Sequence, residues 1–434
     1  MKKIAIATLG CKVNQFESAS FSSSLTEAGG EVVPFAGRAD IYVINTCAVT
    51  GRAGQQSRQL IRRAMKTNPA ARLIITGCYA QTASRDILKI TGSRSVCIVG
   101  NGDKDQVLDA ALAENGGDLP LGDIGKKREI CRLPVRRFNG RTRAFLRIQD
   151  GCNNFCSYCI VPHTRGRSRS LALPEVLEQT AIFSAEGYRE LVITGINVGK
   201  YGLDLDGGKT IYTLLARLCR EFPAMRFRLS SIEPTEVNDS LLELMTGAPN
   251  FMPHLHIPLQ SGDDTILRRM NRRYPAAAFA RAVQQSHDAL PHIAIGCDIL
   301  GGFPGEDNAA HENTRQLLAD LPVTYLHVFP FSRRPGTPAA SMQGQVPKHL
   351  KDERVSQLRA LGREKKLEFY RRHVGTIRQV LVERRNKKTG LLKGFSENYI
   401  PVQFRGPARL TGQIVAIRID RLDKDEPFGT LQNE

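Results

Sequence analysis

The sequence predicts an α/β protein of three parts: an amino-terminal domain with a parallel α/β sheet, a partial (βα)6 barrel and a small carboxyl-terminal β-barrel. In the first third of the chain, short apolar segments alternate with helical ones, which is typical of parallel sheets. Six more strand-like segments follow at intervals of about 30 to 45 residues. At the end, short strand-like segments at residues 379–383, 399–404 and 413–419 are joined by Gly, Asn and Pro turns. We expect the domain boundaries at residues 1–115, 116–138 (a linker), 139–370 and 371–434.

The composition favours a protein with a polyanionic partner. The formal net charge is +18, and an excess of this size is more typical of nucleic-acid binding than of a solvated surface alone. No apolar run approaches the roughly 20 residues that cross a bilayer, and the run at residues 4–9 is too short for a signal peptide. We therefore expect a cytoplasmic protein with no membrane partner. In that compartment the 10 cysteines favour metal and redox chemistry over disulfides.

Three strand-like segments of the first domain each end at a cysteine, and each is followed by a helical stretch. The segments are residues 4–11, 41–47 and 72–78. The carboxyl ends of parallel strands share one edge of a sheet, and open α/β sheets bind ligands there. Cys11, Cys47 and Cys78 can therefore meet in space although 36 and 31 residues separate them. We interpret them as a three-thiolate metal site; the alternative is three unrelated buried cysteines.

A second set of three cysteines follows the first strand of the predicted barrel. Cys152, Cys156 and Cys159 have the spacing C-x3-C-x2-C within one short loop. Thiolates are the ligands of iron–sulfur clusters, and three of them leave one iron of a four-iron cluster open to a small molecule. Zinc is the alternative, but it usually takes a second cysteine pair or two histidines, which do not follow here. Disulfides suit neither the spacing nor the compartment.

The loops after the predicted barrel strands carry polar residues and glycines. The strands are expected at residues 143–148, 190–194, 226–230, 254–257, 293–300 and 325–329. Each loop residue alone could serve a turn, but their repetition at strand ends indicates ligand binding, because glycine permits close approach and polar side chains bond amino and ribose groups. The candidates are Gly195, Asn197, Ser231, Glu233, Gln260 and Asp298.

Arginines are concentrated around the second cysteine loop. Eight arginines and one acid, Asp150, lie between residues 136 and 169. Since arginine suits bidentate contact with phosphate, we interpret Arg165, Arg167 and the neighbouring His163 as candidate substrate contacts. The alternative is an ordinary solvated loop. The other four cysteines have no partner at ligand spacing and are expected to be structural; they are Cys97, Cys131, Cys219 and Cys297.

Several of these motifs resemble one known family. Residues 151–159 (GCNNFCSYC), with Tyr158 just before the third cysteine, resemble the cluster loop of the radical S-adenosylmethionine (SAM) superfamily. Residues 8–15 (TLGCKVNQ), 45–50 (NTCAVT) and 76–78 (TGC) resemble the amino-terminal domain of the methylthiotransferases. Residues 371–434 are similar in position and pattern to a TRAM domain, an RNA-binding β-barrel. The resemblance thus covers nearly the whole chain.

The resemblance implies two [4Fe–4S] clusters, one on each set of three cysteines. The cluster of the barrel loop would bind and cleave SAM, with Tyr158 and the polar loop residues as SAM contacts. The other cluster would hold a sulfur that a first SAM methylates, and the CH₃S group would then be delivered to C2 of an adenine. The signatures look most like the branch that acts on N6-threonylcarbamoyladenosine at position 37 of tRNA. The implied partners are tRNA and an electron donor of flavodoxin or ferredoxin type, while the sulfur donor stays open.

Three alternatives remain open from the sequence. The nearest is the same chemistry on isopentenyladenosine of tRNA or on an aspartate of a ribosomal protein. Another is a radical SAM enzyme of different reaction type, in which the first three cysteines are merely buried. The last is a non-enzymatic iron–sulfur or zinc protein that binds RNA.

Overall fold

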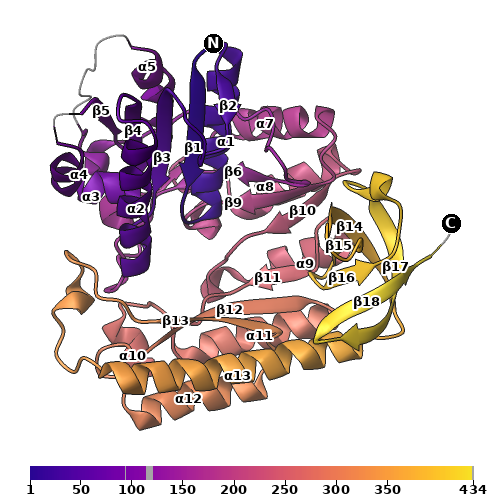
Figure 1. The fold of residues 1–434 in the computed structure, drawn as a ribbon. Coiled ribbons are helices and arrows are strands. Elements are labelled where there is room, and N and C mark those ends of the chain that lie inside the picture. The colour runs from indigo at the N-terminus through magenta and orange to yellow at the C-terminus, as the bar shows by residue number, and fades with distance from the viewer. Residues whose placement is uncertain (93, 114–120, 433–434) are drawn as a thin grey trace.

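The computed structural model describes residues 1–92, 94–113 and 121–432. It confirms the predicted α/β class, with parallel sheets and a closed β-barrel at the carboxyl end (Figure 1). The expected boundary between residues 115 and 116 lies outside the described residues. Among the described helices, none combines the length and the apolar character that crossing a membrane demands.

The first domain is a parallel sheet with strand order β2-β1-β3-β4-β5. The strands are β1 (Lys3–Thr8), β2 (Glu31–Val33), β3 (Ile41–Thr46), β4 (Arg72–Gly77) and β5 (Val96–Val99). The helices are α1 (Lys12–Glu27), α2 (Gly51–Thr67), α3 (Cys78–Thr82), α4 (Ser84–Thr91) and α5 (Val107–Leu112). Strand β3 is buried along its whole length, as expected for a central parallel strand that is apolar on both faces. The sequence does not predict β2, because its three residues are too few to establish a period.

The second part is an arc of six parallel strands in sequence order, which confirms the predicted partial barrel. Isolated bridges, including Ser231 to His256, join its two three-stranded sheets. The strands are β6 (Arg143–Arg147), β9 (Glu190–Thr194), β10 (Arg226–Leu229), β11 (His254–His256), β12 (Ala294–Gly301) and β13 (Tyr325–Pro330). Each matches a predicted segment to within about two residues, which is the usual uncertainty of helix and strand ends.

The connections of the barrel are mostly helical. The helices are α6 (Val161–Arg165), α7 (Leu173–Ala185), α8 (Ile211–Glu221), α9 (Asp239–Gly247), α10 (Asp264–Arg269), α11 (Ala276–Ala289) and α12 (Asn308–Asp320), with α13 (Lys348–Arg372) after the last strand. A short antiparallel pair, β7 (Gln149–Asp150) and β8 (Arg169–Ser170), encloses the second cysteine loop. The loop therefore follows β6, at the carboxyl end of the barrel, where barrels of this kind carry their chemistry.

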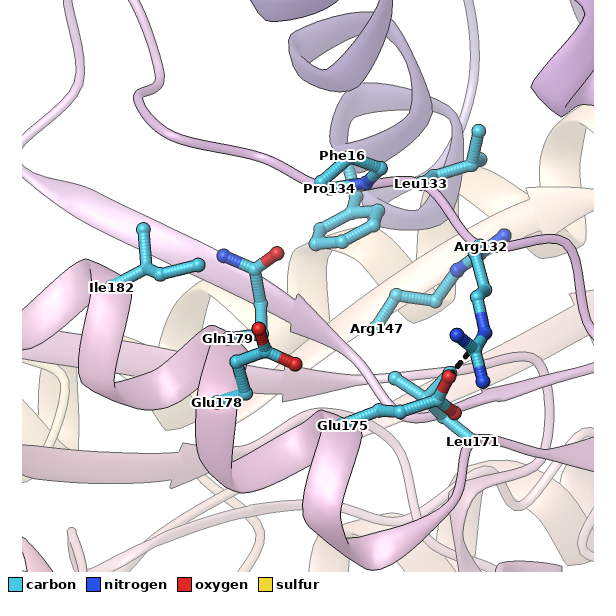
Figure 2. A pocket seen from close by; sticks show the side chains of 10 residues that line it. All are labelled: Phe16, Arg132, Leu133, Pro134, Arg147, Leu171, Glu175, Glu178, Gln179 and Ile182. Atoms are coloured by element: carbon cyan, nitrogen blue, oxygen red, sulfur yellow. Dashed lines mark ion pairs between the residues drawn. The ribbon is translucent and has the colours of Figure 1, made fainter.

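The first domain and the barrel share one apolar core. The ring of Phe138, in the connecting segment, lies 6.4 Å from that of Phe16 on α1 and 5.6 Å from that of Phe145 on β6. Next to it, a cavity of about 200 Å³ separates α1 from α7 (Figure 2). An ion pair between Arg132 and Glu175 bounds this cavity, which contains no cysteine. Burial of these apolar side chains thus packs α1 against the barrel.

The carboxyl-terminal part is a closed five-stranded barrel with strand order β14-β15-β16-β18-β17. The strands are β14 (Ile377–Arg385), β15 (Leu392–Ser396), β16 (Pro401–Phe404), β17 (Ile414–Asp423) and β18 (Glu426–Leu431). The sequence predicts three of them but neither β15 nor β18, because glycines interrupt both runs. The predicted strand at 399–404 begins only at Pro401, because Tyr399 adopts a left-handed turn with φ of +67°.

Candidate iron–sulfur and substrate site

Two glycines let the three cysteine loops of the first domain close on one another. Gly10 has φ of +92°, and a Cβ there would lie 2.7 Å from the Sγ of Cys47. Gly77, just before Cys78, has φ of +96°, and a Cβ there would lie 2.3 Å from the carbonyl oxygen of Thr46. Only glycine combines this backbone with this contact. Cys11, Cys47 and Cys78 thus share one edge of the sheet, as the sequence predicts.

Amide side chains hold these loops in place. Asn14 donates to the carbonyl oxygens of Leu9 at 2.7 Å and Thr46 at 3.0 Å. Asn101 donates to the Sγ of Cys78 at 3.9 Å and to the carbonyl of Thr164 at 2.7 Å. Asn101 therefore connects the first set of cysteines directly to α6, which follows the second cysteine loop.

The surroundings of the thiols oppose their ionisation when no metal is bound. Burial first, and then negative charge on Cys78 and Cys11, raise the pKa of Cys47 to about 11. The mutual effect of the three groups reflects their proximity. A metal must therefore displace the protons, as thiolate sites do on loading.

The second cysteine loop receives hydrogen bonds from three directions. Cys152 Sγ accepts one from the backbone N–H of Asn154 at 3.4 Å and one from the side chain of Asn197 at 3.8 Å. Cys156 Sγ accepts one from Arg272 Nη1 at 3.4 Å. Burial raises the pKa of the Cys159 thiol to about 12. Donors aimed at sulfur tune and orient cluster ligands, so this loop has the outer contacts that a cluster needs.

The residues expected to contact SAM fall into two groups. Asn197 and Glu233 lie next to the cysteine loop, since Glu233 forms an ion pair with Arg272, which donates to Cys156. Gly195 serves a close approach: a Cβ there would lie 2.9 Å from Oε1 of Gln149. Glu233 and Cys156 line a cavity of about 130 Å³.

The other predicted SAM contacts lie elsewhere. Tyr158 packs edge-on against Phe303, with ring centroids 6.4 Å apart. Gln260 holds a left-handed backbone with φ of +66° and donates its N–H to the carbonyl of Asp298. Ser231 and Asp298 line a larger cavity, of about 570 Å³, inside the barrel. Whether each touches SAM stays a prediction.

The larger cavity is lined by all three parts of the chain. Cys11 and Lys12 come from the first domain, Tyr325 comes from the barrel, and Tyr399 comes from the carboxyl-terminal part. Tyr399 reaches in from its turn, where its ring lies 4.4 Å from the ring of His254. The cavity therefore extends from a predicted cluster ligand to several aromatic rings.

Asp298 and two histidines that contact it line one side of this cavity. Asp298 Oδ1 lies 2.9 Å from His256 Nε2 and 3.4 Å from His327 Nδ1. Burial alone would raise the pKa of Asp298, but hydrogen bonds from the two histidines lower it well below its usual value. The nearby His254 is also buried, which depresses its pKa, and its Nδ1 has no hydrogen-bond partner among the described residues.

The three candidate substrate contacts differ in their exposure to solvent. His163 and Arg167 are exposed, and the ring of His163 lies 6.4 Å from that of Phe155 at the tip of the cysteine loop. Arg165 is instead buried, with 1% exposure, and its guanidinium is committed to Asp150 and Glu17. The expected basic rim is therefore smaller than the sequence suggests, because carboxylates distant in sequence neutralise part of it.

Two residues of this site, Gln149 and Arg272, are not predicted from the sequence. Gln149 is fully buried, accepts the N–H groups of Ile196 and Asn197 on Oε1, and donates to the carbonyl of Gly151 at 2.7 Å. Arg272 follows the helix α10, whereas the sequence predicts ligand contacts in the loops directly after strands. The signal for Gln149 in the sequence is an amide side chain at the end of the otherwise apolar and basic run at residues 143–149.

The donor sets fit iron–sulfur clusters. Each set offers three thiols and no histidine within its own loops, and soft thiolate ligands are those that iron–sulfur clusters prefer. The first set also lies beside buried charges with a positive surplus: the cations Lys104, Arg147, Arg165 and Arg169 against the carboxylates Glu17 and Asp150. Thiolates at Cys11 and Cys78 would supply the missing negative charge.

The family models match both cysteine-bearing regions. Residues 3–100 match the Uncharacterized protein family UPF0004, and residues 146–318 match the Radical SAM superfamily. Proteins of that superfamily use SAM and an iron–sulfur cluster, and so does this chain. The position of the second match agrees with the barrel and its cysteine loop.

Solved structures of low sequence identity share the fold. The radical SAM methyltransferase TsrM from Kitasatospora setae, solved with cobalamin and a [4Fe–4S] cluster, aligns with a TM-score of 0.56 at 14% identity and covers 78% of this chain and 77% of its own. The SAM radical enzyme OxsB aligns with a TM-score of 0.53 at 11% identity, covering 84% and 56%. At these identities the likeness concerns the fold alone.

Curated relatives match along almost the entire chain. A threonylcarbamoyladenosine tRNA methylthiotransferase, MtaB, from Bacillus subtilis is 39% identical over 96% of this chain and 94% of its own. The MtaB protein of Aquifex aeolicus is 34% identical over 96% and 100%. From the matched cysteine loops and this full-length similarity, we conclude that the chain belongs to the radical SAM methylthiotransferase family, in the branch of the threonylcarbamoyladenosine tRNA enzymes.

Proposed function

We propose that this protein converts N6-threonylcarbamoyladenosine at position 37 of tRNA into its 2-methylthio derivative, with a [4Fe–4S] cluster on each set of three cysteines. The observation that carries this proposal is the direct connection of the two sets. Asn101 bonds Cys78 on one side and the carbonyl of Thr164, five residues after Cys159, on the other. Cys11 of the first set also lines the barrel cavity. Sulfur transfer to a C–H bond needs this proximity of two centres.

The chain's own residues orient the reaction. When bound, the clusters supply the electron that turns SAM into a radical and the sulfur that is transferred. Asn197 and Arg272 orient Cys152 and Cys156 by donating to their sulfurs. Glu233, paired with Arg272, is suited to the amino group or the ribose of SAM.

The lining of the cavity favours a substrate that carries a carboxylate. Lys12 and Arg141 line it without a carboxylate partner among the described residues. The rings of Tyr325 and Tyr399 also line it, and an aromatic lining suits a base taken out of the anticodon loop. The threonyl group has a carboxylate that would pair with such cations, whereas an isopentenyl group has none. The lining therefore supports the threonylcarbamoyl substrate over isopentenyladenosine.

The partners follow from the same chemistry. The net charge of +18 and the carboxyl-terminal barrel suit binding of tRNA. An external one-electron donor of flavodoxin or ferredoxin type would reduce the cluster that cleaves SAM. The exposed tip of the cysteine loop, with Phe155 at 53% exposure, is where such chemistry is most accessible.

Nucleoside analysis of tRNA tests the proposal. Total tRNA from cells that lack the protein should contain no 2-methylthio-N6-threonylcarbamoyladenosine, and the wild-type gene should restore it. A variant with Cys156→Ser serves as the matched control, because it should fold but not restore the nucleoside. If the nucleoside persists without the protein while another methylthio product disappears, the substrate assignment is wrong.

A further inference from the structure

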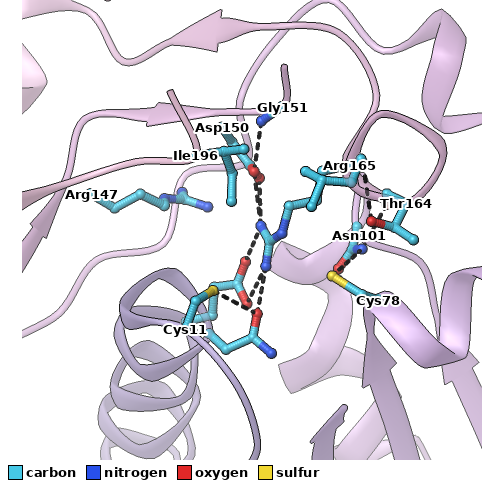
Figure 3. Close-up of polar contacts among 12 residues, drawn as sticks. Cys11, Cys78, Asn101, Arg147, Asp150, Gly151, Thr164, Arg165 and Ile196 are labelled. Carbon is cyan, nitrogen blue, oxygen red and sulfur yellow. Dashed lines mark hydrogen bonds and ion pairs between the residues drawn. The ribbon is translucent and has the colours of Figure 1, made fainter. Parts of the chain in front are cut away.

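Arg165 lies between the two sets of cysteines and contacts the supports of both (Figure 3). It is the last residue of α6, six positions after Cys159, and is 1% exposed. Its guanidinium has five N–H groups in a rigid plane and can therefore hold several acceptors in fixed directions. Acceptors on three residues of two elements use this capacity: Asp150 on β7, and Asn14 and Glu17 on α1.

On the barrel side, Arg165 fixes the start of the second cysteine loop. Its Nη1 lies 2.8 Å and 3.0 Å from the two carboxylate oxygens of Asp150. Asp150 Oδ1 also accepts the N–H of Gly151 at 2.8 Å, one residue before Cys152. Only glycine fits at position 151, since φ is +73° and a Cβ there would lie 1.9 Å from the carbonyl oxygen of Arg167.

On the other side, the same guanidinium reaches the supports of Cys11 and Cys47. Its Nη2 donates to Asn14 Oδ1 at 2.6 Å, and Nη1 donates to Glu17 Oε1 at 3.0 Å. Asn14 Oδ1 also accepts the thiol of Cys11 at 3.7 Å. Glu17 accepts a hydrogen bond from Asn45, two residues before Cys47, at 3.1 Å. One side chain thus reaches Cys11 through one intermediate, Asn14, and the segment before Cys47 through two, Glu17 and Asn45.

The composition of the network argues against a purely structural ion pair. Its three buried cations, Lys104, Arg165 and Arg169, exceed its two buried carboxylates, Glu17 and Asp150, and an uncompensated buried charge is costly. A network that served stability alone would be better neutralised. Anionic sulfur ligands next to the network would balance this surplus of positive charge. Besides the carboxylates, Cys11 and Cys78 are acidic groups that act on Arg165.

We infer that Arg165 is a positioning residue that fixes the two sets of three cysteines relative to each other, so that the radical formed at one site meets the sulfur held at the other. This inference rests on the proposed function. In this role Arg165 binds neither the substrate nor the clusters itself. It acts through its contacts with Asp150, Asn14 and Glu17. Its loss should separate SAM cleavage from sulfur transfer instead of abolishing both.

The test compares Arg165→Lys with wild-type protein after both carry their clusters. Lysine keeps the charge but cannot hold Asp150, Glu17 and Asn14 in one plane. We expect SAM cleavage, measured as 5′-deoxyadenosine, to stay at the wild-type level while methylthiolation falls by about 100-fold, the effect of roughly 1 Å of misplacement. Arg136→Lys is the matched control, because Arg136 forms an exposed ion pair with Glu186 and should change neither activity.

A second readout does not depend on activity. In the apo chain, hydrogen exchange of α1 and of residues 151–159 should accelerate together in Arg165→Lys and stay unchanged in Arg136→Lys. Iron content after reconstitution should match wild type. If Arg165→Lys does not fold or load, Glu17→Gln, which keeps the side-chain shape, should produce the same separation of activities.

The outcomes distinguish the inference from the proposed function. If the wild-type chain forms no methylthio nucleoside, the proposed function fails. If the wild-type chain forms it and Arg165→Lys remains fully coupled, with unchanged hydrogen exchange, the positioning role is refuted. Parallel loss of both activities in a folded, iron-loaded Arg165→Lys variant, or full coupling in Glu17→Gln, would also overturn it.

Discussion

Arg272 donates a hydrogen bond from Nη1 to the Sγ of Cys156 at 3.4 Å, and its other terminal nitrogen pairs with Glu233. A residue remote from the cysteine loop in sequence therefore joins a predicted cluster ligand to a predicted SAM contact. A charged donor to a thiolate contributes about 1.5 to 3 kcal/mol, roughly 10- to 100-fold in an equilibrium.

We accordingly expect Arg272→Leu to lower SAM cleavage by about 10- to 100-fold while iron content is retained. The measurement is 5′-deoxyadenosine formed per cluster by chromatography. Arg268→Leu is the control, because Arg268 is exposed and bonds only Thr265. Undiminished cleavage in Arg272→Leu would remove this residue from the SAM site.

The separate roles of the two cysteine sets can be tested with Cys47→Ala. We expect this variant to cleave SAM at the wild-type rate but to form no methylthio nucleoside, because only the first set is altered. Iron should fall from about eight to about four per chain, as one cubane is lost. Cys97→Ala, buried in β5, is the control with both activities intact. Loss of both activities in a folded Cys47→Ala protein with its other cluster intact would contradict separate roles.

The glycine before Cys11 is expected to be essential for loading the first cluster. Gly10→Ala places a Cβ 2.7 Å from the sulfur of Cys47 in a left-handed backbone, so the ligand must move. We expect about half the iron of wild type and no methylthiolation. Gly29→Ala is a matched control, since Gly29 has φ of +84° but nothing within 4 Å of its added Cβ. It should retain full iron and lose only about 1 kcal/mol of stability. Equal iron contents in the two variants would refute the crowding argument.

The cationic lining of the barrel cavity predicts a selective effect on substrate. Arg141→Leu should raise the KM for tRNA bearing threonylcarbamoyladenosine by about 10-fold or more, because a charged contact is lost. The same variant should act on tRNA without that carboxylate as poorly as wild type does. Arg137→Leu, an exposed neighbour outside the cavity, controls for general loss of tRNA affinity. Equal effects of the two variants on KM would indicate that Arg141 contacts only the phosphate backbone of the tRNA and not the threonyl carboxylate.

The buried His254 makes stability depend on pH. Because burial holds its folded pKa well below 6.5, the unfolded chain binds more protons than the folded chain below that pH. Its contribution to stability is therefore present above about pH 6.5 and is lost as the pH falls. We expect His254→Gln to reduce the drop in Tm between pH 7.5 and 5.5, measured by calorimetry on the apo chain. An unchanged drop would mean that other groups carry the acid sensitivity.

The sequence by itself determined most of the elements and the positions of the candidate ligands. Strand length and apolar character located β3, β4 and β9, because buried parallel strands are continuous apolar runs that can be recognised without information from distant residues. The cysteines at the ends of β1, β3 and β4 indicated a shared site, since the parallel topology brings those ends together.

Only the tertiary structure decided which polar groups face one another. Arg165 resembles a surface phosphate contact in sequence, yet Glu17, 148 residues away, joins Asp150 in burying it. Tyr399 belongs to the carboxyl-terminal part but completes the barrel cavity. These placements depend on charge pairing and packing between elements that meet only after the chain folds, and local periodicity carries no record of such partners.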